Sequence, residues 1–301
     1  MPDPAGLHQD DLSPADVSGG GAADLAETAL ERAERAVEAE IERQKAELSQ
    51  LRRQFEALSS RLAEDLRLAG KVQRGLQPGP VLHPRLDLAR EFIPYREVGG
   101  DYYDVVMLPQ DRVALAVGDV MGKGIPAALL AATLTATVRS QIQSGQSRPC
   151  EVVSHVNRLF WQVSPPGLFA SLFYGVLDLA TGTLDYVNAG HHYPFVLRDE
   201  GGAVELVDGG TVLGLTEEAC FERGRLKLSG SDLLVLYSDG ITDRGNPDGE
   251  MYGLERLEEA ALRSRTDPAR ICLYSILGDI QGWSRGTPAE DDATLIVLKL
   301  R

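Results

Sequence analysis

EVGGDYYDVVML, residues 97–108, places two glycines, two aspartates and two tyrosines inside a segment that otherwise has the pattern of a β-strand. Glycine weakens the interior of a strand, and aspartate is depleted from strands. The sequence offers two explanations for their presence here. The glycines can allow a bulge, and Asp101 can be a carboxylate that must point into a metal site.

Short apolar runs separated by turn residues follow Pro84. YYDVVML and RVALAVGDV flank the tripeptide PQD, which predicts an antiparallel hairpin. Two helices are predicted after these strands, and two more before the final strand DATLIVLKL. Because strands and helices occur in groups rather than in strict alternation, we expect an α+β fold of two packed sheets with helices on their outer faces.

Four aspartates lie at the ends of predicted strands, next to glycine or to another acid: Asp101, Asp119, Asp239 and Asp291. Such a position exposes a carboxylate at the rim of a sheet, where backbone carbonyls also come close. Oxygen ligands of this kind suit Mg²⁺ or Mn²⁺. Clustered carboxylates repel one another unless cations neutralise them. One Asp-Gly pair alone is typical of a turn, but the four together predict a metal site.

The composition limits the possible functions. The chain has 301 residues and a formal net charge of -15, with no block of basic residues, which argues against binding to nucleic acid or to an anionic membrane. Its three cysteines, Cys150, Cys220 and Cys272, have no CxxC spacing and are expected to be reduced thiols. We find no apolar run long enough for a membrane span and no secretory signal, and we expect a cytoplasmic protein.

Five motifs occur in a characteristic order: VGGDYYD, VGDVMGKGIPAALL, NAGHHYPFVL, LYSDGITD and EDDATLIVLKL. With them, the chain resembles the PPM (PP2C-like) metal-dependent serine/threonine phosphatases, in particular the bacterial stress-response and sporulation branch called the RsbU/SpoIIE family. The resemblance covers about residues 70–301. It implies an α-β-β-α sandwich, in which two mostly antiparallel sheets are flanked by helices and two divalent cations, Mn²⁺ or Mg²⁺, lie between the sheets.

The resemblance also implies a role for each main acidic residue. Asp101 and Asp119 would be metal ligands, and Asp119 would bridge both ions. The backbone carbonyl of Val120 would add a further ligand, and Asp239 and Asp291 would hold the second ion. These residues would together form the catalytic centre.

Other motif positions have weaker or indirect roles in the family. Asp104, Asp243 and Asp292 match acidic positions that support the ligands, and Asp243 matches one that can instead bind an extra metal ion weakly. Arg96 matches the position of a phosphate-binding arginine in eukaryotic relatives, and a surface arginine is the alternative. The GHH segment, residues 190–192, is expected at a strand end near the metal edge rather than as a ligand.

The activity implied by the resemblance is hydrolysis of phosphoserine or phosphothreonine in proteins. Two cations about 3.5–4 Å apart lower the pKa of a bridging water, and the resulting hydroxide attacks phosphorus in line. The implied substrate is a phosphorylated anti-anti-sigma (STAS) partner-switching protein. The alternatives are a pseudophosphatase or binding module in a sigma-factor partner switch, and a hydrolase of small phosphoesters. The intact set of four main aspartates favours the enzyme.

The N-terminal part has a different character. Residues 1–22 are rich in Pro, Gly, Asp and Ser and are expected to be disordered. Residues 23–76 contain no proline and are predicted to form one helix. QPGP, residues 77–80, should end that helix, and residues 80–301 should form the phosphatase domain.

A heptad repeat runs along this helix. One series of the repeat includes Ile41, Leu48, Phe55 and Leu62. The pattern predicts a parallel coiled-coil homodimer through residues 23–76. A single amphipathic helix that packs on its own domain is the alternative. The segment LRLAGKVQRGLQPG resembles the family's helical linker, so we hypothesise that the coiled coil sets the order of the metal site, in response to an activating regulatory protein.

Overall fold

The computed structural model describes residues 20–145, 148–199 and 201–301. The chain divides into two compact units, Met1–Ala63 and Glu64–Arg301, which we describe separately. Helix α1 (Gly20–Gly75) belongs to both units. The disorder expected for residues 1–22 falls mainly outside the described residues, but residues 20–22 already form the start of α1.

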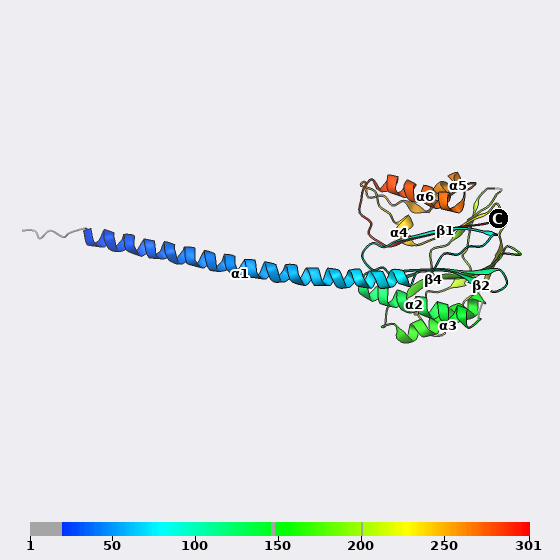
Figure 1. Cartoon of the computed structure of the whole chain (residues 1–301), viewed down its shortest axis with the longest axis horizontal. Helices are drawn as coiled ribbons and strands as arrows, with labels where there is room; N and C mark the ends of the chain where they lie inside the picture. The colour runs from blue at the N-terminus through cyan, green and yellow to red at the C-terminus, as the bar shows by residue number, and fades with distance from the viewer. Residues whose placement is uncertain (1–19, 146–147, 200) are drawn as a thin grey trace, which may run out of the picture. The chain divides into compact units, whose positions relative to one another are not determined.

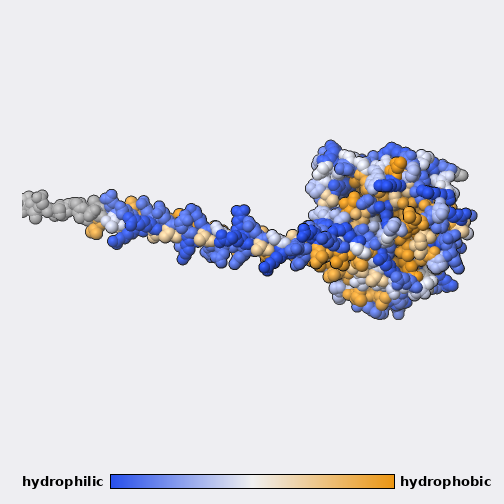
Figure 2. Space-filling model, in the orientation of Figure 1, coloured by the Kyte–Doolittle hydropathy of each residue, from blue (hydrophilic) through white to orange (hydrophobic). Residues whose placement is uncertain are grey.

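The described part of the first unit is a single helix with an exposed apolar stripe. The exposed fractions of the heptad residues Ile41, Leu48, Phe55 and Leu62 lie between 44% and 68%. Figure 2 shows hydrophilic side chains over most of this helix, with apolar patches at intervals. Ion pairs between neighbouring turns, such as that between Arg43 and Glu40, line the polar surface. A helix of this kind has no core of its own and is stable only weakly without a partner.

The second unit contains two sheets in its described residues. All strand pairs are antiparallel except that of β5 with β8. The first sheet has the spatial order β1 (Leu86–Ile93), β11 (Ala293–Leu300), β10 (Leu233–Tyr237), β6 (Phe195–Leu197) and β7 (Ala203–Glu205). The second has the order β2 (Asp101–Leu108), β3 (Arg112–Val120), β4 (Ala170–Asp178), β5 (Thr183–Ala189) and β8 (Gly209–Gly210), with β9 (Gly224–Lys227) also paired to β5.

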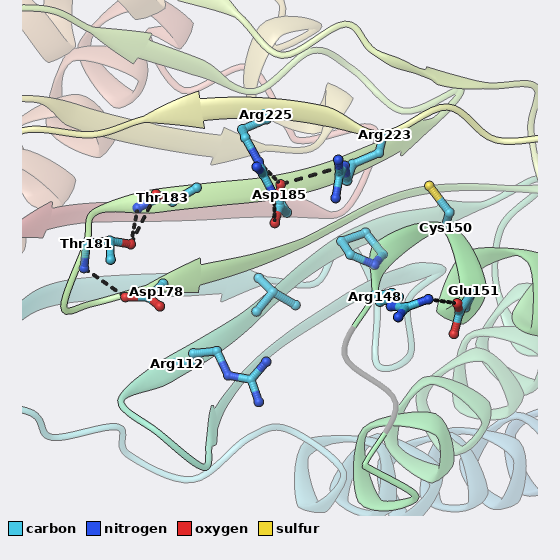
Figure 3. Close-up of a pocket in the computed structure, with 12 residues that line it drawn as sticks. Arg112, Arg148, Cys150, Glu151, Asp178, Thr181, Thr183, Asp185, Arg223 and Arg225 are labelled. Atoms are coloured by element: carbon cyan, nitrogen blue, oxygen red, sulfur yellow. Dashed lines mark hydrogen bonds and ion pairs between the residues drawn. The ribbon is translucent and has the colours of Figure 1, made fainter.

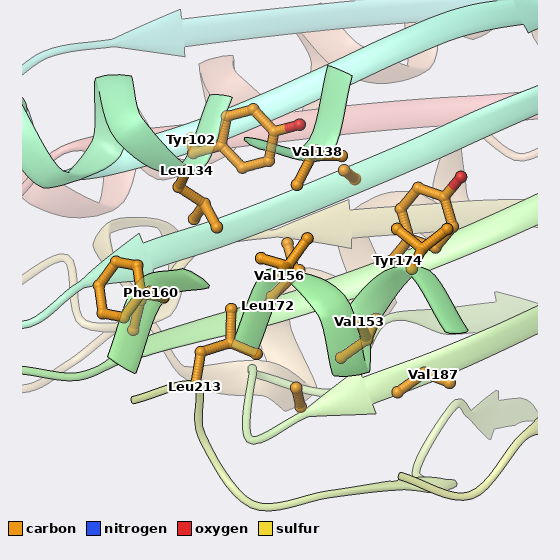
Figure 4. Packing of buried hydrophobic residues seen from close by; sticks show 14 of the residues in the cluster. Tyr102, Leu134, Val138, Val153, Val156, Phe160, Leu172, Tyr174, Val187 and Leu213 are labelled. Atoms are coloured by element: carbon orange, nitrogen blue, oxygen red, sulfur yellow. The ribbon is translucent and has the colours of Figure 1, made fainter. Parts of the chain in front are cut away.

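Helices cover the outer face of each sheet (Figure 1). Helices α2 (Ile125–Gln143) and α3 (Pro149–Val163) pack on the β2–β5 sheet, where Leu134, Val156 and Leu172 are fully buried (Figure 4). Helices α5 (Gly253–Arg263) and α6 (Ala269–Ser284) pack on the other sheet. The predicted α-β-β-α sandwich is therefore confirmed.

The central strands are apolar on both faces, and this explains their sequences. In β3, Val113, Leu115 and Val117 point between the sheets, whereas the alanines between them face α2 and α3. In β10, Leu234 and Leu236 point between the sheets, and Val235 between them faces α5 and α6. Strands buried on both faces give nearly continuous apolar runs, as in RVALAV and LLVLY. None of the described helices is both long and apolar enough to cross a membrane.

Candidate metal centre

Asp101 and Asp119 are brought together by the register of two neighbouring strands. Asp101 is the first residue of β2, and its Cα partner in β3 is Asp119. Partners directly opposite in an antiparallel pair point to the same face. Since Asp119 alternates in step with Val117 and Leu115, both carboxylates face the space between the sheets, at its open end.

The other sheet contributes two more acids to this end. Asp239 begins the short helix α4 (Asp239–Thr242) immediately after β10 and Ser238. Asp291 lies two residues before β11. Both are partly buried, as is Asp119. The four aspartates that were predicted at strand ends therefore lie at one edge of the sandwich, which we call the acidic edge or, as the candidate cation site, the metal edge.

Two hydroxyl groups link Asp101 to the opposite sheet. The Oγ of Ser238 and the Oγ1 of Thr294 each donate to Asp101 Oδ2, at 2.6 Å. Asp101 is only 7% exposed. Because Oδ2 already accepts two hydrogen bonds, Oδ1 is the oxygen through which Asp101 could reach a metal ion, directly or through water. Sequence reasoning missed both hydroxyls, although Ser238 directly precedes Asp239 and Thr294 lies two residues after Asp292.

The carboxylates raise one another's pKa. Burial raises the pKa of Asp119 from 3.8 to about 7, and the charges of Asp239, Asp291 and Asp292 add to the effect. Burial and then the charge of Asp119 raise the pKa of Asp101 well above its usual value. The pKa of Asp239 is raised by burial and by Asp291. Such repulsion is relieved when cations neutralise the group.

Asp292 organises the loop before β2. Its carboxylate accepts hydrogen bonds from the backbone N–H groups of Tyr95, at 2.8 Å, and Gly100, at 2.6 Å. A Cβ at Gly99 would collide with this carboxylate, and a Cβ at Gly100 would lie 3.1 Å from the Val120 carbonyl oxygen. The expected bulge inside the strand is therefore wrong: the glycines precede β2 and allow close approach to Asp292 and Val120.

A neutral histidine, His191, is linked to the Asp119 backbone through Ser171. The Asp119 N–H donates to Ser171 Oγ at 3.3 Å, and Ser171 Oγ lies 2.8 Å from His191 Nδ1. His191 Nε2 lies 3.0 Å from the carbonyl oxygen of Tyr237, which can only accept. The Nε2 atom therefore carries the proton, and burial lowers the pKa of His191 to about 3. His191 therefore joins the two sheets through both of its ring nitrogens.

Three weaker candidates from the sequence have different surroundings. Asp104 is buried and forms an ion pair with Arg139 of α2 at 2.6 Å. It is three residues from Asp101 in an extended strand, so it points to the opposite face and does not support the metal edge. Asp243 is exposed beside Asp239. Arg96 is exposed, with its guanidinium carbon 5.0 Å from the centroid of the Tyr95 ring.

The donors at this edge fit hard divalent cations. Among the described residues, no three His, Cys, Asp or Glu side chains already surround a common point as ligands would. The side chains are nevertheless all oxygen donors that repel one another, and Lys123 Nζ lies 2.8 Å from Asp291 Oδ2, where a positive charge is needed. Asp119, Asp239 and Asp291 are the acids that could hold the ions, with Asp101 behind them.

A separate hollow of about 520 Å³ lies at the far end of the β2–β5 sheet (Figure 3). It includes Arg112 at the start of β3, whereas Asp119 is near the end of that strand. Asp185 accepts hydrogen bonds from Arg225 Nε at 2.6 Å and Nη2 at 2.9 Å. This hollow is remote from the acidic edge, and carboxylates accompany its arginines.

The layers and the acidic edge between them define a PP2C-like fold. Residues 109–301 match the family described as Stage II sporulation protein E (SpoIIE). This match covers more than half of the chain, which therefore belongs to the SpoIIE family. The family expectation from the sequence motifs is confirmed.

Individual relatives agree with this assignment. The chain is 29% identical to Protein IcfG of Synechocystis sp. over 238 residues, which are 69% of this chain and 37% of the relative. It is 28% identical to Phosphoserine phosphatase RsbU of Bacillus subtilis over 246 residues, which are 80% of this chain and 72% of the relative. The chain thus spans little more than a third of IcfG but most of RsbU.

Solved structures show the same fold. The RsbU and RsbW domains of a Mycobacterium tuberculosis protein align with a TM-score of 0.62 at 29% identity, covering 72% of this chain and 60% of that one. The SiaA-PP2C domain of Pseudomonas aeruginosa aligns with a TM-score of 0.73 at 19% identity, covering 81% of this chain and 98% of that one.

The raised pKa of Asp119 predicts how the stability of the metal-free protein depends on pH. The unfolded chain releases the Asp119 proton near pH 3.8, whereas the folded chain keeps it to about pH 7. The folded state thus binds more protons in this window, and the free energy of unfolding should fall as pH rises through it. Thermal unfolding in a chelator, between about pH 5 and about pH 7.5, measures this decrease.

Asp119→Asn provides the comparison, because the amide does not titrate. Its melting temperature should decrease less than that of the wild type over the same window, and Mn²⁺ should stabilise the wild type more at the upper end. If both proteins lose stability equally as pH rises, the carboxylates do not repel one another in the way described.

Proposed function

We propose that this chain is a metal-dependent protein phosphatase that hydrolyses phosphoserine or phosphothreonine. The observation that carries the proposal is the convergence of Asp119, Asp239 and Asp291 at one edge of a PP2C-like sandwich, with Asp101 hydrogen-bonded behind them. RsbU and RsbP of Bacillus subtilis, which are 28% and 27% identical to this chain, are both named phosphoserine phosphatases. A magnesium complex of RsbX has the same fold, and this likeness accords with metal dependence.

The chain's own residues prepare this edge for catalysis. When bound, two divalent cations, Mn²⁺ or Mg²⁺, would lower the pKa of a water molecule and offset the negative charge of the phosphoryl group. Asp119, Asp239, Asp291 and the Val120 carbonyl would hold them. The Ser238 and Thr294 hydroxyls fix the Asp101 carboxylate, so that its Oδ1 can orient a ligand or a water at the edge. Asp292 holds the loop that closes behind Asp101.

We assign as substrate a phosphorylated anti-anti-sigma (STAS) protein, and an activating regulatory protein as partner. The similarity to RsbU and the alignment to a protein that combines RsbU and RsbW domains support this partner-switching role. We place the reaction in the cytoplasm, because Cys150, Cys220 and Cys272 are all free thiols.

The direct test is release of phosphate from a phosphoserine STAS protein in the presence of Mn²⁺ or Mg²⁺. Asp119→Asn and Asp239→Asn should each reduce the rate at least about a hundredfold, because each removes a charge that holds a cation. A chelator should abolish the activity. The measurement is phosphate released per unit time at saturating metal.

Asp111→Asn is the matched control for these variants. Asp111 is exposed in the hairpin turn at the far end of β3, and its φ of 52° is one that asparagine accepts. This variant should retain the wild-type rate. Activity that survives the chelator, or that survives both Asp119→Asn and Asp239→Asn, refutes the two-metal mechanism. A wild-type protein that is inactive on any phosphoserine STAS protein favours the binding-module alternative.

The end of α1 is hydrogen-bonded to the loop that carries the metal edge, and this supports regulation through the linker. The Gln73 side chain donates to the Gly99 carbonyl at 2.7 Å, and its Oε1 accepts from the Gly99 N–H at 3.0 Å. Gly70 lies so close to the Glu97 carbonyl oxygen that a Cβ there would collide with it. A shift of the helix would therefore move the loop that ends in Gly100 and Asp101.

The exposed heptad stripe supports the proposed coiled-coil homodimer. Leu48 is 66% exposed and Phe55 is 68% exposed in the single chain. Burying large apolar side chains at regular seven-residue intervals against a second copy is the usual way in which such a helix gains stability. The dimer would hold α1 and, through Gln73, the loop before β2.

Two variants separate dimerisation from the contact with the loop. Leu48→Glu combined with Phe55→Glu should make the chain monomeric in sedimentation equilibrium and change the phosphatase rate. Gln73→Ala should leave the dimer intact but reduce the rate about tenfold, as loss of a supporting hydrogen bond at a metal site does. The regulatory proposal is contradicted if the monomeric variant and Gln73→Ala both match the wild-type rate at saturating Mn²⁺.

A further inference from the structure

Lys123 is held in a sharply turned loop between β3 and α2. It is flanked by Gly122 with φ of 97° and Gly124 with φ of 76°. Residues with a side chain rarely adopt such φ values, so the two glycines let the chain reverse at this point. The loop begins directly after Val120 and therefore places Lys123 beside the acidic edge.

The Lys123 side chain crosses the edge and contacts the opposite sheet's loop. Its Nζ lies 2.8 Å from Asp291 Oδ2 and donates to the Glu290 carbonyl oxygen at 2.6 Å. It also lies 5.8 Å from the centroid of the Tyr95 ring. The side chain is 50% exposed, so a change of rotamer can move the ammonium group without disturbing the core.

Lys123 and Asp291 line a hollow of about 320 Å³ beside the metal edge. The hollow also includes Asp243 and Arg244, and the Arg244 guanidinium donates to the Thr287 carbonyl at 2.7 Å. Because Lys123 contacts Asp291 directly, a phosphoryl group bound beside Asp291 would lie near its ammonium group. Arg96, which the sequence suggested for phosphate binding, is also exposed and lies over the same Tyr95 ring.

We propose that the Lys123 ammonium pairs with two anions in turn, the Asp291 carboxylate when the edge lacks metal and the substrate's phosphoryl group when metal is bound. This inference rests on the proposed phosphatase function. A divalent cation bound to Asp291 would neutralise the carboxylate in place of Lys123. The ammonium then has a stronger anion within reach, because a phosphoserine carries a charge of about −1.5 to −2. Lysine serves as a point-charge phosphate binder in other sites.

Lys123→Met tests both parts of the proposal, the pairing with Asp291 and the pairing with phosphate. The substitution removes the charge and keeps an unbranched side chain. Isothermal titration calorimetry with Mn²⁺ alone should show binding several-fold tighter than in the wild type, since the competing ammonium is lost. With phosphorylated STAS protein as substrate, KM should rise roughly tenfold, whereas kcat should change less. Lys123→Arg should have a KM close to that of the wild type, because arginine also places a cation at this position.

Lys227→Met is the matched control, since Lys227 is an exposed lysine of β9 outside the acidic edge. It should match the wild type in both measurements. An unchanged Mn²⁺ affinity of Lys123→Met refutes the competition for Asp291, and an unchanged KM refutes phosphate binding. If Asp119→Asn remains active, the proposed function fails; if it is inactive while Lys123→Met has the wild-type KM, only the present inference fails.

Discussion

Mutual repulsion of carboxylates at one open end of the sandwich is the constraint on which the rest of the structure depends. Asp101 and Asp119 come from one sheet, whereas Asp239 follows β10 and Asp291 precedes β11 of the other. Burial and proximity raise the pKa of Asp119 to about 7. A chain that keeps such a cluster needs a cation there, and Lys123 supplies a single positive charge beside Asp291. Divalent cations would neutralise the cluster more completely.

The surrounding hydrogen bonds hold these acids in place from both sheets. Asp101 accepts the hydroxyls of Ser238 and Thr294, so it links the two sheets across the edge. His191 forms a second link, through Ser171 on one side and the Tyr237 carbonyl on the other. Such links keep ligands oriented before a metal arrives, which favours a functional rather than a purely structural cluster. The same edge receives the end of α1 through Gln73 and Gly99.

Much of this arrangement follows from local sequence pattern. Runs buried on both faces define the strands, and the acids at their ends could be located because glycine and apolar residues flank them. Alternation along β2 could also have excluded Asp104, which lies on the face opposite Asp101 and pairs with Arg139. The roles of Ser238, Thr294 and Lys123 could not be read in this way. They depend on how the two sheets face each other and on a loop reversal, and neither leaves a local periodic signal.

Anomalous diffraction at the manganese edge, from crystals grown with Mn²⁺, tests the central claim most directly. We expect two peaks about 3.5–4 Å apart between the sheets, with Asp119 beside both and with Asp239 and Asp291 beside the second. The Lys123 ammonium should have moved away from Asp291 in the same crystals. Manganese bound elsewhere, or no manganese beside Asp119 at saturating concentration, would contradict it.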